Sequence, residues 1–269
     1  MANQRRFEKP IIRWAGSKRK LVPLLLDNVP STFDRYVEPF CGSACLFFSL
    51  KPKSALLSDI NEELVNALNF LKSSRDARKE LLKLPNTKEE YYRIRAINPS
   101  TLSNSGRAIR FLYLNRYCFN GVYRTNKQGK FNVPRGTKTG GIPSSEVFDL
   151  AYETLKCAEI SSNDYKQTLS KLVEGDFAYI DPPYTKLGKF TGEYGLGSFD
   201  EGNIEEFCEE LRKLNSRGVK FLFSYRESDL LSKLLGKSFQ SKNIPVKRHV
   251  SGFKTSWQES SEVLIKNYE

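Results

Sequence analysis

The chain has 269 residues, and 43 lysines and arginines against 31 aspartates and glutamates give it a formal net charge of +12. Its single histidine excludes a metal site built on two histidines and leaves one residue on which a Ser–His–Asp triad would depend. The basic balance indicates a polyanionic partner, most often nucleic acid, but it does not locate the binding surface.

Length and composition predict one large α/β domain, or a core domain that carries a smaller insert. No apolar run approaches the ~18–20 residues that span a bilayer, and the first residues lack the apolar stretch of a signal peptide. Five cysteines without a C-x-x-C pair indicate reduced thiols. We therefore expect a cytoplasmic protein (in the host-cell cytoplasm if the source is viral) that has no membrane partner and no metal.

The first part of the chain, residues 1–72, alternates short apolar runs with helical patterns. Residues 35–40 and 54–59 are typical of short buried strands, and the helical patterns at 45–50 and 61–71 follow them. Strand, helix, strand, helix predicts a parallel sheet with right-handed crossovers. This part is predicted to begin a catalytic α/β domain.

Residues 73–145 differ in composition, because the segments with helical periodicity there are rich in lysine and arginine. They are followed by a segment rich in glycine, asparagine, proline and cations. Two alternating runs within residues 122–133 flank a turn at Asn126–Gly129, which predicts a β-hairpin. The expected helices cover residues 76–84, 89–97 and 107–117.

The α/β pattern resumes in residues 146–269, which are predicted to complete the catalytic domain. An amphipathic helix is expected at residues 205–214. The sequence therefore predicts one α/β domain interrupted by a basic insert. Further strands are expected at residues 157–161, 177–180, 221–225 and 259–268.

The strongest chemical motif is the tetrapeptide Asp181-Pro182-Pro183-Tyr184, which follows a predicted strand. Ligands of an open parallel sheet bind beyond the carboxyl ends of its strands. The amino group of adenine is a poor nucleophile because its lone pair is delocalised. Two acceptors aimed at its N–H bonds, the Asp181 carboxylate and the Pro182 carbonyl, would free that lone pair. The prolines hold the acceptor rigidly, and Tyr184 offers a ring for base stacking. A simple strand-ending turn is the alternative.

Two further motifs suit a nucleotide-like ligand. Residues 37–43 run from a strand into a small-residue turn and a helix, where the backbone can approach a ligand. Asp59 ends the next strand, where an acid can bind ribose hydroxyls. Residues 12–18 combine Trp14, a glycine and cations. An ordinary βα turn and a surface loop anchored by Trp14 are the respective alternatives.

Taken in order, these motifs resemble those of the Dam-type adenine-N6 DNA methyltransferases (D12 class, alpha group). The resemblance runs from IIRWAGSK through VEPFCGS, SDINEEL, the segment at residues 115–136 and YIDPPY to SEVLIKNY, nearly the whole chain. It implies a Rossmann-like S-adenosylmethionine-dependent methyltransferase domain. It also implies an inserted helical and β-hairpin domain that recognises DNA.

The resemblance assigns roles to the motif residues, with S-adenosylmethionine as the cofactor. Ser17 and Ser43 replace usual glycines, and we expect these small changes to alter cofactor affinity at most. Cys41 is interpreted as structural, since direct transfer to N6 needs no covalent enzyme intermediate. The implied catalytic residues are Asp181, Pro182, Pro183 and Tyr184. The implied cofactor-binding residues are Trp14, Ala15, Gly16, Lys18, Glu38, Pro39, Phe40, Gly42, Asp59, Asp164, Tyr165 and Asp181.

Many cations surround the predicted hairpin, and a hairpin can enter the major groove, where arginine reads guanine. Arg124 is the best candidate for such a reader, with Val122 and Pro134 near a thymine methyl. By resemblance the target is GATC. For the other cations, contact with phosphate or solvent alone is the alternative. The expected DNA-binding residues are Arg13, Arg95, Arg116, Asn120, Val122, Arg124, Asn126, Pro134 and Lys138.

We therefore expect an enzyme that binds duplex DNA, flips one adenine and methylates its N6. The alternatives are an amino-methyltransferase acting on RNA or on a protein glutamine, and a non-catalytic DNA-binding protein. A cognate restriction endonuclease is a possible functional, not physical, partner. A monomer or weak dimer is expected.

Overall fold

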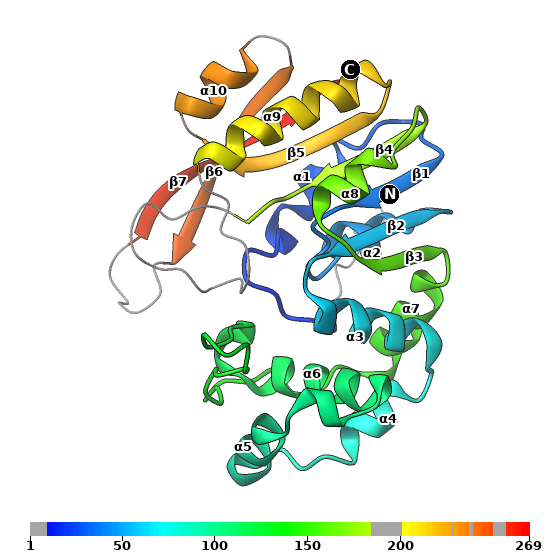
Figure 1. The fold of residues 1–269 in the computed structure, drawn as a ribbon, viewed down its shortest axis with the longest axis vertical. Helices are drawn as coiled ribbons and strands as arrows, with labels where there is room; N and C mark the ends of the chain where they lie inside the picture. Colours follow the sequence, from blue (N-terminus) through cyan, green and yellow to red (C-terminus); the bar gives the residue numbers. More distant parts are fainter. Residues whose placement is uncertain (1–9, 184–200, 228, 237–238, 250–256) are drawn as a thin grey trace, which may run out of the picture.

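The computed structural model describes residues 10–183, 201–227, 229–236, 239–249 and 257–269. Its centre is one seven-stranded sheet, seen in Figure 1. The strands are β1 (Arg35–Glu38), β2 (Ala55–Asp59), β3 (Ala158–Ser162), β4 (Asp176–Ile180), β5 (Lys220–Arg226), β6 (Gln240–His249) and β7 (Trp257–Lys266).

Helices cover both faces of this sheet and also form a separate group beside β3 (Figure 1). The α-helices are α1 (Val22–Leu26), α2 (Cys45–Leu50), α3 (Glu62–Ser73), α4 (Ala77–Leu82), α5 (Lys88–Ala96), α6 (Asn104–Tyr117), α7 (Ser145–Leu155), α8 (Tyr165–Ser170), α9 (Glu201–Ser216) and α10 (Asp229–Leu235). Short 3₁₀ turns are η1 (Arg19–Leu21), η2 (Pro99–Thr101) and η3 (Phe119–Gly121).

The strand order is β3-β2-β1-β4-β5-β7-β6. Strands β1 to β5 are parallel and follow the 3-2-1-4-5 order of a doubly wound Rossmann sheet. Strand β7 is antiparallel to both β5 and β6. The parallel arrangement expected from the first strands is thus confirmed and extends over β1 to β5, whereas the last two strands are antiparallel. Residues 250–256 are too few for a parallel crossover, which needs a dozen or more residues.

Alternating side chains of the strands fill two separate cores, one on each face of the sheet. In β2, Leu57 belongs to one core and Leu56 to the other. Helices α3, α6 and α7 contribute to the first core, for example through Leu64. Helices α8, α9 and α10 contribute to the second, for example through Phe207. Burial on both faces explains why the central strands are nearly continuous apolar runs.

Every strand expected for the central sheet is present, whereas the sequence does not predict β6. Its residues read QSKNIPVKRH, and Ile244 is buried while Gln240, Ser241, Lys242 and Asn243 are exposed. Such a polar run lacks the alternation that identifies a strand. It is tolerated because β6 lies at the edge of the sheet, where Pro245 does not interrupt a central ladder.

A largely helical segment separates α3 from α7 and lies beside the β3 edge of the sheet, as Figure 1 shows. We call this segment, from the end of α3 at Ser73 to the start of α7 at Ser145, the insert. It contains α4, α5, α6 and an irregular loop. The boundaries of separate domains at residues 72 and 145 stay a prediction, because α3 and α7 also pack into the core shared with α6.

The predicted hairpin in the insert is a tight antiparallel loop without regular strands. Thr125 pairs with Phe131, and the Asn126 N–H donates to the Lys130 carbonyl at 2.9 Å. The Asn126 side chain accepts two further backbone N–H groups at 3.0 Å and closes the turn. Within the described residues no third strand pairs with the tip, and an isolated two-stranded hairpin is marginal in water. We call residues 119–136 the recognition loop.

Candidate active site

A cavity of about 190 Å³ lies at the carboxyl ends of β1, β2 and β4. Strand order reverses between β1 and β4, which is where open α/β sheets bind ligands. Five stretches of sequence meet there, and all residues expected to bind the cofactor line the cavity: Trp14, Ala15, Gly16, Lys18, Glu38, Pro39, Phe40, Gly42, Asp59, Asp164, Tyr165 and Asp181. Their binding roles stay predictions.

Of the expected catalytic residues, Asp181, Pro182 and Pro183 line the same cavity, and Tyr184 lies outside the described residues. Several lining residues were missed by the sequence reasoning. Most are chain neighbours of motif residues, and Tyr179 could have been found because it precedes Asp181 by two positions on one strand. The missed residues are Ser17, Cys41, Ser43, Cys45, Ile60, Asn61, Asn163 and Tyr179.

The Asp181 carboxylate is held by two partners. Lys18 is buried, and its Nζ lies 2.6 Å from Asp181 Oδ1. The Ser224 hydroxyl, on β5, donates to the same oxygen at 3.1 Å and lies 3.2 Å from the Tyr179 hydroxyl. Burial raises the pKa of Asp181, and the Lys18 ammonium opposes that shift. The arrangement fixes the orientation of a carboxylate at the cavity wall.

Asp59 joins the turn after β1 to the end of β2. Its Oδ2 accepts the Gly42 N–H and its Oδ1 accepts the Asn61 N–H, both at 3.0 Å. Burial raises the pKa of this carboxyl. Each carboxylate oxygen keeps a second lone pair, so Asp59 retains acceptor capacity for hydroxyl groups of a ligand.

Gly42 is required by close packing as well as by its backbone. Its φ is +46°, and an added Cβ would lie 2.7 Å from Cδ1 of Trp14. The indole therefore rests directly on the turn that follows β1. Only glycine fits this position without displacing the ring.

Glu38 is the most deeply buried carboxyl of the cavity, with 2% of its surface exposed. Its Oε1 accepts the Tyr36 hydroxyl at 2.6 Å and the Phe47 N–H at 3.0 Å. Burial raises its pKa to about 8, although both hydrogen bonds favour ionisation. The carboxyl is therefore mainly protonated at neutral pH, and a cationic ligand group beside it would favour the ionised form.

Phe40 and Tyr165 form an aromatic wall of the cavity at the start of α8. Phe40 and Tyr165 stack with ring centroids 5.2 Å apart and planes 27° apart. Asp164 caps α8 by accepting the Lys166 N–H at 2.9 Å. A flat face beside a carboxylate is the kind of surface that binds a planar base.

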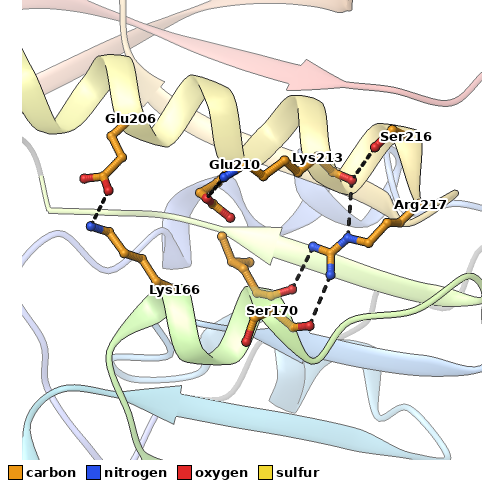
Figure 2. A network of polar contacts seen from close by, with 8 residues as sticks. Lys166, Ser170, Glu206, Glu210, Lys213, Ser216 and Arg217 are labelled. Carbon is orange, nitrogen blue, oxygen red and sulfur yellow. Dashed lines mark hydrogen bonds and ion pairs between the residues drawn. The ribbon is translucent and has the colours of Figure 1, made fainter.

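Helix α8 is held against α9 by the polar network in Figure 2. Lys166 pairs with Glu206, and the Arg217 guanidinium donates to the last carbonyls of α8, at 3.1 Å to Ser170 and 3.0 Å to Leu169. These bonds satisfy carbonyls that a helix end leaves without partners. They fix the helix whose first turn carries Tyr165.

The two buried thiols of the cavity are poor nucleophiles. Burial raises the pKa of Cys45 to about 12 and raises that of Cys41 well above its usual value. A nucleophilic cysteine needs its thiolate, which both environments disfavour. These pKa shifts support the structural interpretation of Cys41.

Most residues expected to bind DNA lie on the exposed surface of the insert. The Arg124 Nε donates to Asn132 Oδ1 at 2.8 Å across the recognition loop, and both side chains remain accessible. The exposed members of the predicted set are Asn120, Arg124, Asn126, Pro134 and Lys138. The half-buried members are Arg13, Arg95 and Val122.

Arg116 does not fit its predicted DNA contact. It is 5% exposed, and its guanidinium donates to the carbonyls of Gly141 at 2.8 Å and of Ile11 at 3.2 Å. Burial lowers its pKa to about 10, and the nearby Arg13 adds to this effect. The structure corrects the prediction, because this arginine ties the insert to the N-terminal segment instead of facing solvent. The basic composition of the segment could not reveal that difference.

Comparison with known families decides the class of the protein. The family model of the D12 class N6 adenine-specific DNA methyltransferases matches residues 14–251. The chain belongs to this family. It is therefore an adenine-N6 DNA methyltransferase, an enzyme that requires a methyl donor and acts on DNA.

Relatives of this DNA methyltransferase match over most of their length. The type II methyltransferase M1.LlaDCHI of Lactococcus lactis subsp. cremoris is 31% identical, with 97% of this chain and 95% of the relative covered. The type II methyltransferase M.MjaIII of Methanocaldococcus jannaschii is also 31% identical, with 97% and 99% covered. The DNA adenine methylase of Serratia marcescens is 32% identical, with 82% and 85% covered.

One solved structure that matches this DNA methyltransferase is the rRNA methyltransferase aviRa of Streptomyces viridochromogenes. It has a TM-score of 0.41 at 13% identity, covering 94% of this chain and 86% of that one. Among the described helices of the methyltransferase, none combines the length and the apolarity needed to cross a bilayer.

Replacing Arg116 with methionine should destabilise the DNA methyltransferase without changing its contacts with DNA. Buried carbonyls of Gly141 and Ile11 would lose their donor, which we expect to lower the free energy of unfolding by about 2–4 kcal/mol. Urea unfolding measures this loss. The exposed Lys138 is the matched control. Lys138→Met should leave stability within about 0.5 kcal/mol and lower the slope of log K against log salt by about 1. If Arg116→Met instead lowers the salt slope and leaves the free energy of unfolding unchanged, Arg116 is a DNA contact after all.

Replacing Glu38 with glutamine should change the pH dependence of stability. The pKa of Glu38 is about 8 in the folded protein against 4.5 normally, so the folded state binds more protons between these values. Its contribution to stability is present at low pH and is lost as pH rises towards 8. Glu38→Gln should remove this slope, which is at most about 1.4 kcal/mol per pH unit for a single proton. Urea titrations of ligand-free protein across the range measure it, with the exposed Glu159→Gln as control. Parallel curves for wild type and Glu38→Gln would contradict the proposed protonation.

Proposed function

We propose that this DNA methyltransferase transfers the methyl group of S-adenosylmethionine to N6 of the adenine in duplex GATC, after that base has been flipped out of the helix. One observation carries the proposal: Asp181 and the Pro182-Pro183 turn open into the same cavity as the motifs of β1, β2 and the N-terminal segment. A methyl donor in that cavity would lie next to the proposed acceptors for an adenine amino group.

The described residues of the cavity fit S-adenosylmethionine. Asp59 offers acceptor capacity for ribose hydroxyls, and the stacked rings of Phe40 and Tyr165 offer a flat face for an adenine. The missing Cβ at Gly42 lets the Trp14 indole rest on the turn, and both residues line the cavity. Buried Glu38 suits a cationic ligand group. When bound, the cofactor supplies an electrophilic methyl group on a sulfonium.

The residues around Asp181 suit direct transfer to an amino group. The Asp181 carboxylate and the Pro182 carbonyl would accept the two N–H bonds of adenine N6 and free its lone pair for attack. Both contacts from Lys18 and Ser224 fall on Oδ1, so Oδ2 would receive the adenine N–H. The cofactor would supply a methyl group and leave as a neutral thioether, and methyl transfer to N6 would make an N6 proton acidic. That proton leaves through Asp181 to solvent, and a strong base is not needed.

The recognition loop supports sequence-specific binding to duplex DNA. Its exposed Arg124 lies beside a tight turn, where a guanidinium can make a bidentate contact with guanine O6 and N7. Exposed Lys127, Lys130 and Lys138 would contact phosphates, which set affinity and register without reading sequence. Two relatives are named type II methyltransferases, which supports a cognate restriction endonuclease as a functional partner.

Expression in a host that lacks adenine methylation tests the target. Host DNA should become resistant to a nuclease that needs unmethylated GATC and sensitive to one that needs methylated GATC. Purified enzyme should label duplex DNA but neither RNA of the same sequence nor a protein glutamine. Methylation of RNA or protein alone would overturn the proposal, and DNA binding without transfer would favour a non-catalytic protein.

Replacing Asp181 with alanine should abolish methyl transfer and leave DNA binding largely intact, because an acceptor for the adenine amino group is lost. A labelled-methyl assay on GATC duplexes measures transfer, and a gel-shift assay measures binding. Asp149→Ala, at an exposed position on α7, is the control and should keep wild-type activity. Equal transfer by Asp181→Ala and wild type would exclude the proposed role.

Replacing Arg124 with alanine should weaken recognition at one base pair by about 1–3 kcal/mol. The measurement compares binding to GATC duplexes with binding to duplexes changed at each single position. Lys127→Ala lies on the same turn and should lower affinity for all sequences alike. An Arg124→Ala enzyme with unchanged site preference would show that this arginine does not read a base.

A further inference from the structure

The indole of Trp14 lies between the cavity and the insert. One side rests on Gly42, where an added Cβ would come within 2.7 Å of the ring. The indole also stacks with the Tyr123 ring, with centroids 6.0 Å apart and planes 24° apart. Phe111 on α6 completes the contact, with its ring centroid 6.5 Å from that of Trp14. A wall of the cavity is therefore supported by side chains of the insert.

Tyr123 connects this wall to the rest of the recognition loop. It follows Val122 and precedes Arg124, and its ring centroid lies 5.6 Å from those of both Phe111 and Phe131. Burial raises its pKa to about 12. Tyr123 thus touches Trp14, which lines the cavity, and stands next to the proposed base reader.

The backbone beside Trp14 is clamped by the same insert. Asn115, buried in α6, accepts the Arg13 N–H at 2.8 Å and donates to the Arg13 carbonyl at 2.6 Å. Gly121, at the start of the recognition loop, packs so closely on Arg13 that an added Cβ would lie 2.4 Å from its Cβ. Such packing leaves little room for independent movement, because close-packed interiors transmit displacement.

We infer that Tyr123 is a positioning residue that couples the cavity to the recognition loop, by stacking on Trp14. This inference rests on the proposed function, since it requires a cofactor in the cavity and a GATC duplex on the loop. The cofactor sets the position of Trp14, Tyr123 follows the indole, and Arg124 follows Tyr123. Each ligand therefore strengthens binding of the other, as reciprocal coupling requires.

The flat ring of residue 123 is the feature that carries the coupling. Phenylalanine keeps the stacked face, whereas leucine keeps apolar volume and loses it. An aromatic pair is worth up to roughly tenfold in an equilibrium beyond the area that it buries. We therefore expect Tyr123→Phe to retain the coupling and Tyr123→Leu to reduce it by about three- to tenfold.

The experiment measures the dissociation constant of S-adenosylhomocysteine by calorimetry, with and without a GATC duplex. The ratio of the two constants is the coupling. Tyr152→Leu is the matched control, because this half-buried tyrosine on α7 stacks with the surface cations Arg75 and Lys156. It should leave the ratio unchanged. Tyr123→Met is measured as a second non-aromatic variant. Because methionine fills irregular gaps, it provides a folded variant without the ring if Tyr123→Leu does not fold.

A second readout follows the indole itself. The chain has two tryptophans, so Trp257→Phe leaves Trp14 as the only one. Adding the duplex to the S-adenosylhomocysteine complex should change Trp14 fluorescence, and Tyr123→Leu should remove most of that change. A loss of stability alone would lower the thermal unfolding temperature, but it would not selectively remove the fluorescence change that the duplex causes.

The outcomes separate the inference from the proposed function. The inference alone is overturned if the wild-type protein methylates GATC and folded Tyr123→Leu has the same coupling ratio as the wild type. It is also overturned if the wild-type protein methylates GATC but shows no coupling at all. Wild-type protein that does not bind S-adenosylhomocysteine would overturn the proposed function, and the inference with it. A reduced ratio in Tyr123→Leu, retained in Tyr123→Phe and Tyr152→Leu, supports the inference.

Discussion

The buried ion pair between Lys18 and Asp181 joins the N-terminal segment to the end of β4, and the rest of the cavity is arranged around it. Removing two charges from water is costly, so the pair persists only because its geometry is close and further bonds complete it. Ser224 supplies one of those bonds, and the Gly16 carbonyl accepts from Lys18 at 3.3 Å. The ammonium also opposes the rise in the pKa of Asp181 that burial causes. A carboxyl group paired with an ammonium and fixed in direction is suited to accept a hydrogen bond from an amino group.

The same N-terminal segment also contacts the insert, and this dual contact gives the molecule its organisation. Lys18 faces the end of β4, while Trp14 contacts Tyr123 and Arg13 is held by Asn115. Residues that form the cavity are therefore only a few positions away from residues that support the recognition loop. Movement of the loop on DNA and filling of the cavity cannot be mechanically independent when one short, close-packed segment connects them.

Much of the candidate site could be predicted from sequence because of a geometric rule. Strand ends of a parallel sheet meet at one edge, so Glu38, Asp59 and Asp181 had to converge once their strands were recognised. Contacts between distant segments could not be predicted in the same way. Nothing in composition or periodicity places Tyr123 on Trp14, or tells a buried arginine from an exposed one. The edge strand β6 was missed for a related reason, since its polar sequence carries no burial signal.

The net charge of +12 overstates the cationic surface that the insert offers to a polyanion. Part of its basic content is used internally: Arg116 and Arg110 donate to backbone carbonyls, and Arg107 pairs with Glu63. Exposed cations remain on the loop and its continuation, including Arg124 and Lys138, and also on and beside α4 and α5, including Lys79 and Lys88. Because phosphate contacts need accessible charge, the proposed DNA binding depends on these exposed cations and not on the internal ones. In this proposal the basic composition serves two separate purposes, holding the insert against the N-terminal segment and presenting cations to the duplex.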